Sequence, residues 1–182
     1  MIEKIGSFER PNWDVYFMIQ AVLAKLRSNC LSRQIGAVIV KDNRQISTGY
    51  NGTPSGLINC FEGGCKRCYD RIKGSIKSSE CLERCLCVHA EANAILQCVI
   101  YGNAGNTING TLYSTVSPCL ECSKMAITVG IKRIVVLDRY TEDLSKYTIN
   151  GVDILEQANV QFIKMNPIEI DHWFTKLGKS DV

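Results

Sequence analysis

The stretch "GTLYSTVSPCLECSKMAITVGIKRIVVL", residues 110–137, contains a complete strand–helix–strand pattern. The β-rich run at 110–116 predicts one strand, and the apolar run at 131–137 predicts another. Between them, residues 119–129 have the periodicity of a helix, and Gly130 follows at the position where helices commonly end. Alternation of this kind is typical of an α/β domain.

The same alternation continues on both sides of this stretch. Asn12 is a favoured N-cap residue ahead of a helical apolar stripe, and the turn "KDNR" at 41–44 separates two β-rich runs. The further elements expected are a helix at 12–26, a hairpin at 35–51, a helix at 89–101, a helix at 149–158, a strand at 160–165 and a Pro-initiated helix at 167–177. We therefore expect a three-layer α/β/α fold, in which helices cover both faces of a mixed five-stranded sheet.

The composition is that of a soluble globular protein. The 182 residues are 46% apolar and 21% charged, which suits a single domain over residues 1–182. There is no run of about 18 apolar residues, and the start "MIEKIGSFERPNW" lacks the apolar segment of a signal peptide. A net charge of +3 is too small to indicate a protein that binds polyanions. We expect a cytoplasmic protein without a membrane or nucleic-acid partner.

Ten cysteines in a chain without an export signal indicate metal sites or reactive thiols more than disulfides. Six of them crowd into residues 60–87, within a longer segment, 52–88, that contains no convincing periodic element. A structureless segment of this length is uncommon in a compact domain unless it is functional or held in place. We therefore expect a cysteine-rich insert at about 57–88.

One histidine and two cysteines predict a catalytic zinc site. Cys119 and Cys122 are three residues apart at the start of a predicted helix, so both thiolates can point at one metal. His89, at the start of another predicted helix, supplies a third ligand and leaves the fourth zinc position open. Glu91 then lies in the first helical turn, where a carboxylate suits proton transfer for an activated water. An H-x-E pair alone more often caps a helix, but the combination with C-x-x-C is much more specific.

These motifs carry a resemblance to a known family. H-A-E at 89–91 and P-C-L-E-C at 118–122 match the signature of zinc-dependent deaminases. The run from 13 to 56, with its G-Y-N-G-x-P-x-G loop at 49–56, resembles the deoxycytidylate (dCMP) deaminases. The likeness covers roughly residues 12–164.

The resemblance implies hydrolysis of dCMP to dUMP and ammonia, which supplies the precursor of dTMP; dCTP is a second candidate substrate. Zinc would be held by His89, Cys119 and Cys122, with Glu91 moving the proton. The resemblance also implies a homohexamer that is regulated by dCTP and dTTP as allosteric effectors.

Four residues are candidates for substrate contacts on the same grounds. Asn51 matches a sugar-binding asparagine, Ser117 a position in the base pocket, and Tyr140 an aromatic residue close to the pyrimidine. Arg33 could bind the phosphate through two hydrogen bonds. Asn51 can equally be a turn former, and Arg33 a solvated surface arginine.

A second, structural zinc is expected in the insert. Cys30 and Cys60 match two cysteine ligands of the phage-type members of the family, whose other ligands are two histidines four residues apart. This chain has Cys81 and Cys85 at that spacing, so we expect ligation by four cysteines. The C-x-x-C at 65–68 is a competing pair, and a zinc knuckle that touches nucleic acid is an alternative role for it.

Two other functions stay open at this point. A deaminase that edits transfer RNA or single-stranded nucleic acid would share the zinc site but needs a basic or aromatic channel for the strand. A non-catalytic, zinc-stabilised binding module would leave Glu91 without a role.

Overall fold

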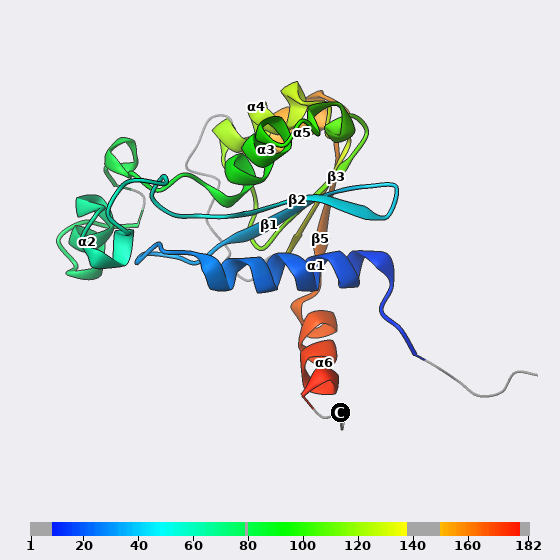
Figure 1. Ribbon diagram of the computed structural model, residues 1–182, viewed down its shortest axis with the longest axis horizontal. Coiled ribbons are helices and arrows are strands. Elements are labelled where there is room, and N and C mark those ends of the chain that lie inside the picture. Colours follow the sequence, from blue (N-terminus) through cyan, green and yellow to red (C-terminus); the bar gives the residue numbers. More distant parts are fainter. Residues whose placement is uncertain (1–8, 79, 138–149, 179–182) are drawn as a thin grey trace, which may run out of the picture.

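The computed structural model describes residues 9–78, 80–137 and 150–178. In them, five strands form one sheet in the order β2-β1-β3-β4-β5 (Figure 1). Neighbouring strands are antiparallel from β2 to β3 and parallel from β3 to β5, so the sheet is mixed, as predicted. The strands are β1 (Gly36–Lys41), β2 (Arg44–Tyr50), β3 (Thr111–Ser114), β4 (Arg133–Leu137) and β5 (Gln161–Met165).

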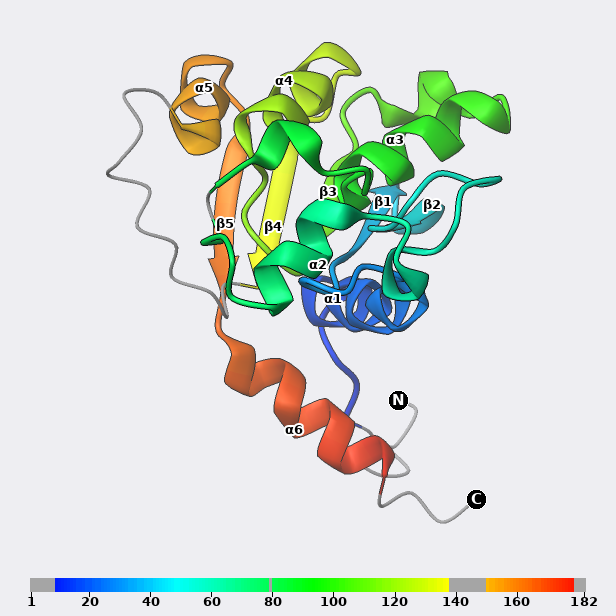
Figure 2. The ribbon, with the colours of Figure 1, turned by 90° about the vertical axis from the view of Figure 1, so that its left-hand side faces the viewer.

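Helices cover both faces of this sheet (Figures 1 and 2). On one face lie α1 (Trp13–Ala24) and α6 (Pro167–Leu177). On the other face lie α3 (Ala90–Ile100), α4 (Leu120–Thr128) and α5 (Gly151–Gln157). The three-layer α/β/α prediction is therefore confirmed. None of the helices in the described ranges is both long and apolar enough to span a bilayer.

The sheet separates two apolar cores. In β1, Ala37 and Ile39 belong to the core beneath α3, whereas Val38 and Val40 belong to the core against α1. Successive side chains of a strand point to opposite faces, so a strand covered on both sides must be apolar throughout. Each fully buried valine or isoleucine contributes roughly 1.5–3 kcal/mol.

Local signals in the sequence act as expected at the ends of these elements. Asn12 caps α1, since its Oδ1 accepts a hydrogen bond from the Val15 N–H at 2.9 Å. Asp42 and Asn43 join β1 to β2 with φ of 49° and 55°, a left-handed conformation that these two residue types tolerate in hairpin turns. Gly130, with φ of 79°, follows α4 in the conformation that glycine adopts most easily.

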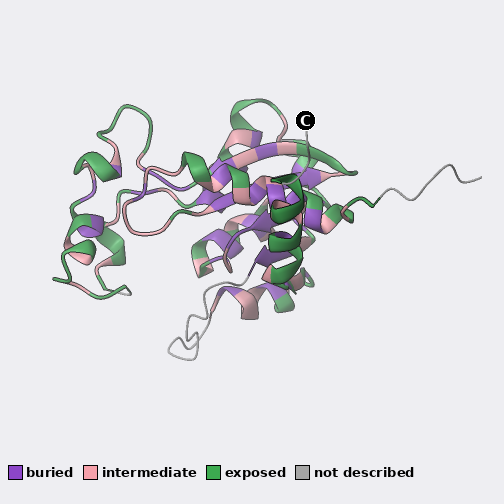
Figure 3. Ribbon diagram, turned by 90° about the horizontal axis from the view of Figure 1, so that it is seen from below, coloured by how far each residue is buried: buried purple, intermediate pink, exposed green. Residues whose placement is uncertain are grey.

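The insert has more regular structure than the sequence indicated. The expectation of no periodic element across 52–88 was wrong for Lys66–Ile72, which forms α2. Two short 3-10 turns, Cys60–Glu62 and Leu82–Arg84, accompany it. At seven residues, α2 is too short to show a clear helical period. The insert projects from the end of the sheet as a lobe whose surface is largely exposed (Figures 1 and 3). That residues 1–182 make one domain with this insert stays a prediction.

A half-buried ion pair joins α1 to the sheet. The guanidinium of Arg133 donates hydrogen bonds to both carboxylate oxygens of Asp14, at 2.7 and 2.6 Å. The hydroxyl of Tyr113 donates to the same carboxylate at 2.7 Å. The bonds from Arg133, followed by the bond from Tyr113, lower the pKa of Asp14 below its ordinary value. These contacts hold α1 in one position over β3 and β4.

Candidate active site

The starts of α3 and α4 bring three candidate ligands together. His89 immediately precedes α3, and Cys119 immediately precedes α4. The Nδ1 atom of His89 lies 3.4 Å from Cys119 Sγ and 3.5 Å from Cys122 Sγ. A tetrahedral zinc ion with bonds of about 2.0 Å to nitrogen and about 2.3 Å to sulfur would hold such atoms about 3.6 Å apart. The three side chains therefore fit one zinc ion, which is the grouping that the sequence predicted.

The surroundings of Cys119 favour a thiolate. The hydrogen bond from the Cys122 thiol, followed by that from His89, lowers the pKa of Cys119 to about 4. Cys119 also lies at the N-terminus of α4, where the partial positive charge of the helix stabilises an anion. Cys122 is buried, whereas His89 is open to solvent, so one side of the site is accessible to a small molecule.

Glu91 is buried in the first turn of α3, with 2% of its surface exposed. Burial raises the pKa of its carboxyl group above the ordinary value. Among the described residues its carboxylate is not part of the ligand group formed by His89, Cys119 and Cys122. Glu91 is therefore placed beside the metal site as a group that can hold and release a proton.

Ser114 supports Glu91, and the sequence analysis missed it. Its hydroxyl donates a hydrogen bond to Glu91 Oε1 at 2.9 Å. Ser114 is the last residue of β3 and is fully buried. Leu112, two residues earlier, points into the core beneath α3. Ser114 lies on the same face of β3 as Leu112. A polar residue on this apolar face was the signal in the sequence that could have identified it.

The structure describes three of the four residues that were predicted to contact the substrate. The side chain of Asn51 is buried and is used inside the protein: Oδ1 accepts from the Ile35 N–H at 2.8 Å, and Nδ2 donates to the Arg33 carbonyl at 2.8 Å. Ser117 is half-buried just before α4. Tyr140 lies outside the described residues. All of these roles stay predictions, but Asn51 has a structural role in addition.

The Arg33 side chain lies on the insert side of the molecule. Its Nη2 donates to Ser78 Oγ at 3.3 Å, and this contact is exposed to solvent. A role in binding phosphate therefore stays a prediction for Arg33.

A surface groove elsewhere on the molecule is not part of this site. A groove of about 840 Å³ lies between the start of α1 and the turn that joins β1 to β2. Trp13, Tyr16 and Arg44 line it, and none of the zinc-site residues does. Deamination requires metal ligands and a proton carrier, and these are His89, Cys119, Cys122 and Glu91. We therefore assign the active site to these residues and not to the groove.

Comparison with known proteins agrees with this geometry. Residues 11–138 match the family model described as the cytidine and deoxycytidylate deaminase zinc-binding region. The chain belongs to this deaminase family. The match includes His89, Glu91, Cys119 and Cys122.

Two relatives are deoxycytidylate deaminases. The chain is 46% identical to the deoxycytidylate deaminase of Saccharomyces cerevisiae over 147 residues, which cover 81% of the chain and 44% of that protein. It is 43% identical to the deoxycytidylate deaminase of Schizosaccharomyces pombe over 163 residues, or 88% of the chain and 46% of that protein. The chain thus spans less than half the length of these two relatives.

A solved structure supports the deaminase fold. The crystal structure of the dCMP deaminase from the cyanophage S-TIM5, in complex with dCMP and dUMP, is 30% identical and superposes with a TM-score of 0.65. The alignment covers 87% of this chain and 100% of the cyanophage protein.

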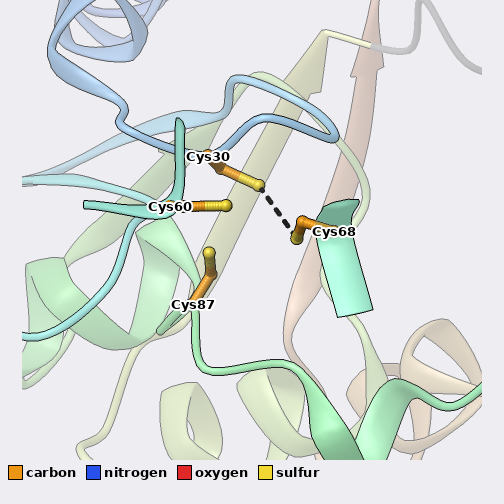
Figure 4. Close-up of side chains that lie close together, drawn as sticks. All are labelled: Cys30, Cys60, Cys68 and Cys87. Atoms are coloured by element: carbon orange, nitrogen blue, oxygen red, sulfur yellow. Dashed lines mark hydrogen bonds between the residues drawn. The ribbon is translucent and has the colours of Figure 1, made fainter. Parts of the chain in front are cut away.

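Two further groups of possible ligands lie in the insert and at its base, where Cys30 follows α1. The first group is Cys30, Cys60, Cys68 and Cys87 (Figure 4). The second group is Cys65, Cys68, Cys85 and Cys87. Cys30 and Cys60 thus lie together as expected, but Cys81 is in neither group of the described residues, and Cys85 is in the other one. Cys81 has a left-handed backbone, φ of 54°, and begins the 3-10 turn Leu82–Arg84, so Cys81 and Cys85 do not share one turn of an α-helix.

Proposed function

We propose that this protein deaminates dCMP by hydrolysis, giving dUMP and ammonia, and so supplies the precursor of dTMP. The observation that carries the proposal is the buried Glu91 beside three ligands that fit one zinc ion and are open to solvent at His89. A zinc-stabilised binding module would have no use for this arrangement, because burying a carboxylate costs free energy.

The residues divide the reaction between them. When bound by His89, Cys119 and Cys122, a zinc ion supplies Lewis-acid chemistry that makes the attacking water more acidic. Glu91 accepts a proton from that water as oxygen attacks C4 of the cytosine ring. Glu91 then gives this proton to ring N3. It next takes the remaining proton from the new C4 hydroxyl and passes it to the 4-amino group, so that ammonia leaves and C4 becomes a carbonyl. Its raised pKa suits a group that must be charged before the attack and protonated after it.

Two observations support a free nucleotide, and not polymerised nucleic acid, as the substrate. The deaminases of Saccharomyces cerevisiae and Schizosaccharomyces pombe are both named for deoxycytidylate. The net charge of +3 is also too small for the basic channel of a strand-binding enzyme. We further propose that dCTP is a second substrate and that the insert binds structural zinc. We also propose that the protein forms a homohexamer whose activity is regulated by dCTP and dTTP.

A substrate panel tests the proposal. Purified protein should release ammonia from dCMP with a kcat/KM far above that for deoxycytidine, because the nucleoside lacks the charged group that binds in the transition state. Single-stranded oligonucleotides should not react. Turnover of oligonucleotides alone would instead assign an editing enzyme, and no turnover of any of these substrates would assign a binding module. The dCTP arm of the same panel decides whether the triphosphate is a substrate.

A further inference from the structure

Six cysteines of the insert and its base form one connected cluster. Each of the two four-cysteine groups has its sulfur atoms within 4.8 Å of one another, and the groups share two members, Cys68 and Cys87. Together the two groups contain six different cysteines, which we call the six-cysteine cluster: Cys30, Cys60, Cys65, Cys68, Cys85 and Cys87. Figure 4 shows that the side chains of the first group converge, with Cys68 presented by α2.

The sulfur–sulfur distances match metal coordination and not disulfides. Cys68 Sγ lies 3.8 Å from Cys30 Sγ and 3.8 Å from Cys85 Sγ, so it contacts one unshared cysteine of each group. Cys65 and Cys85 are 3.9 Å apart. A disulfide bond is only about 2.05 Å long. The edge of a zinc–sulfur tetrahedron, with bonds of about 2.3 Å, is about 3.8 Å.

Among its described residues, the insert has no apolar core that could replace metal ions. In the described part of the chain, its buried apolar residues form a cluster of cysteines, and Leu31 and Cys85 pack against this cluster as partly buried members. Its large apolar side chains are instead exposed, among them Leu57, Ile58 and Phe61 at 53%, 66% and 57%. Burial therefore contributes little to the stability of this lobe, and another source of stability is required.

Backbone N–H groups point at the sulfur atoms that the two groups do not share. Hydrogen bonds of this type stabilise a negatively charged sulfur. The donors are Leu31 to Cys60 at 3.2 Å, Leu86 to Cys65 at 3.4 Å, Ser32 and Arg33 to Cys30, and Cys87 to Cys85. Each of the four unshared sulfur atoms thus accepts at least one backbone hydrogen bond, an arrangement that suits a metal-bound sulfur. A zinc ion in only one group would leave two of these four sulfur atoms without a metal ion.

We propose that the six-cysteine cluster binds two zinc ions, with the thiolates of Cys68 and Cys87 bridging them. Each ion then has four sulfur ligands, and both sites are closed, as in structural zinc sites. Six thiolates with two zinc ions carry a net charge of −2, whereas six thiolates with one ion would carry −4. Each group is sized for a single ion, since its sulfur atoms all lie within 4.8 Å.

The cluster also fixes the start of the active-site helix. Cys87 is two residues before His89, and Val88 between them forms an isolated β-bridge with Gly52. The loop after α1 joins the cluster through Cys30, so the cluster connects both sheet faces at this end of the molecule. Its role is structural, and it does not depend on the proposed deamination.

The number of zinc ions bound by the protein tests this inference. We expect three per chain, two in the cluster and one at the catalytic site, measured by elemental analysis after dialysis. His89→Ala should leave two, which separates the cluster from catalysis whether or not the protein deaminates dCMP. Two zinc ions in the unaltered protein would overturn the proposal.

Substitutions distinguish shared from unshared ligands. Cys65→Ser should lower the count by one, since it removes a ligand of only one ion. Cys68→Ser should lower it by two, and Cys81→Ser, as a matched control in the same lobe, should leave it unchanged. If Cys68→Ser does not fold, cadmium NMR of the unaltered protein is an independent measurement. It should show two all-sulfur cadmium sites coupled through shared thiolates, and uncoupled resonances would overturn the bridging.

Discussion

Gly49 lies in β2 directly beneath α3, the helix that carries Glu91 and follows His89. A Cβ atom at Gly49 would be 2.1 Å from the Ala90 carbonyl oxygen and 2.4 Å from the Ala94 nitrogen. Both are backbone atoms of α3, so no side chain can rotate to relieve the clash. Restoring an ordinary contact of 3.4 Å requires α3 to move by about 1.3 Å (3.4 minus 2.1).

The expected effects of Gly49→Ala follow from this displacement. Overpacking of this kind costs about 1–3 kcal/mol. For a chain of this size Tm falls by about 2–4 °C per kcal/mol, so we expect a decrease of roughly 2–12 °C. Moving His89 away from Cys119 should weaken zinc binding at the catalytic site. Misplacement of catalytic groups by about 1 Å can reduce the rate roughly 100-fold.

Three measurements check this prediction: Tm by calorimetry, catalytic zinc content, and kcat/KM for dCMP. Gly105→Ala is the matched control, because a Cβ atom there meets nothing within 4 Å and the φ angle is not in the left-handed region. An unchanged Tm and kcat/KM in Gly49→Ala would refute the claim that β2 sets the position of α3. A loss equal to that in Gly105→Ala would do the same.

Three further substitutions have defined outcomes. Glu91→Gln should keep the catalytic zinc and lower kcat by about 10²–10⁴-fold, because it removes the proton carrier and no ligand. Asp14→Asn should lower the free energy of unfolding at pH 7 by about 1–3 kcal/mol. Since the native pKa of Asp14 is lowered, this contribution is present above its unfolded pKa of about 3.9 and is lost as pH falls through the lower native value. Asn51→Ala should lower the free energy of unfolding by about 1–3 kcal/mol for each buried group left unpaired.

Each of these predictions has an outcome that contradicts it. Zinc loss in proportion to activity would show that Glu91 acts through the metal ligands. A stability difference between Asp14→Asn and the unaltered protein that persists after Asp14 is protonated in the folded state would exclude the ion pair as its source. Glu121→Gln, at an exposed pair with Lys124, is the control. A raised KM without loss of Tm would assign Asn51 to substrate binding alone.

Local geometry was determined by the sequence itself. The cap at Asn12, the turn at Asp42 and Asn43, and the end of α4 at Gly130 each depend on a few neighbouring residues, so residue type was sufficient to predict them. Cys119 and Cys122 share one helical turn, and their convergence was predictable for the same reason. The layers of the fold followed from alternating periodicity, because each apolar face must be covered by another element.

Only the tertiary structure decided which distant groups meet. Ser114 reaches Glu91 because β3 and α3 pack together, and neither residue lies within a helical turn of the other. Cys68 and Cys87 are shared between two groups, while Cys81, at a regular spacing from Cys85, belongs to neither. Spacing along the chain determines distance only within one regular element, and the ligands of the six-cysteine cluster come from separate segments whose approach depends on packing and coordination.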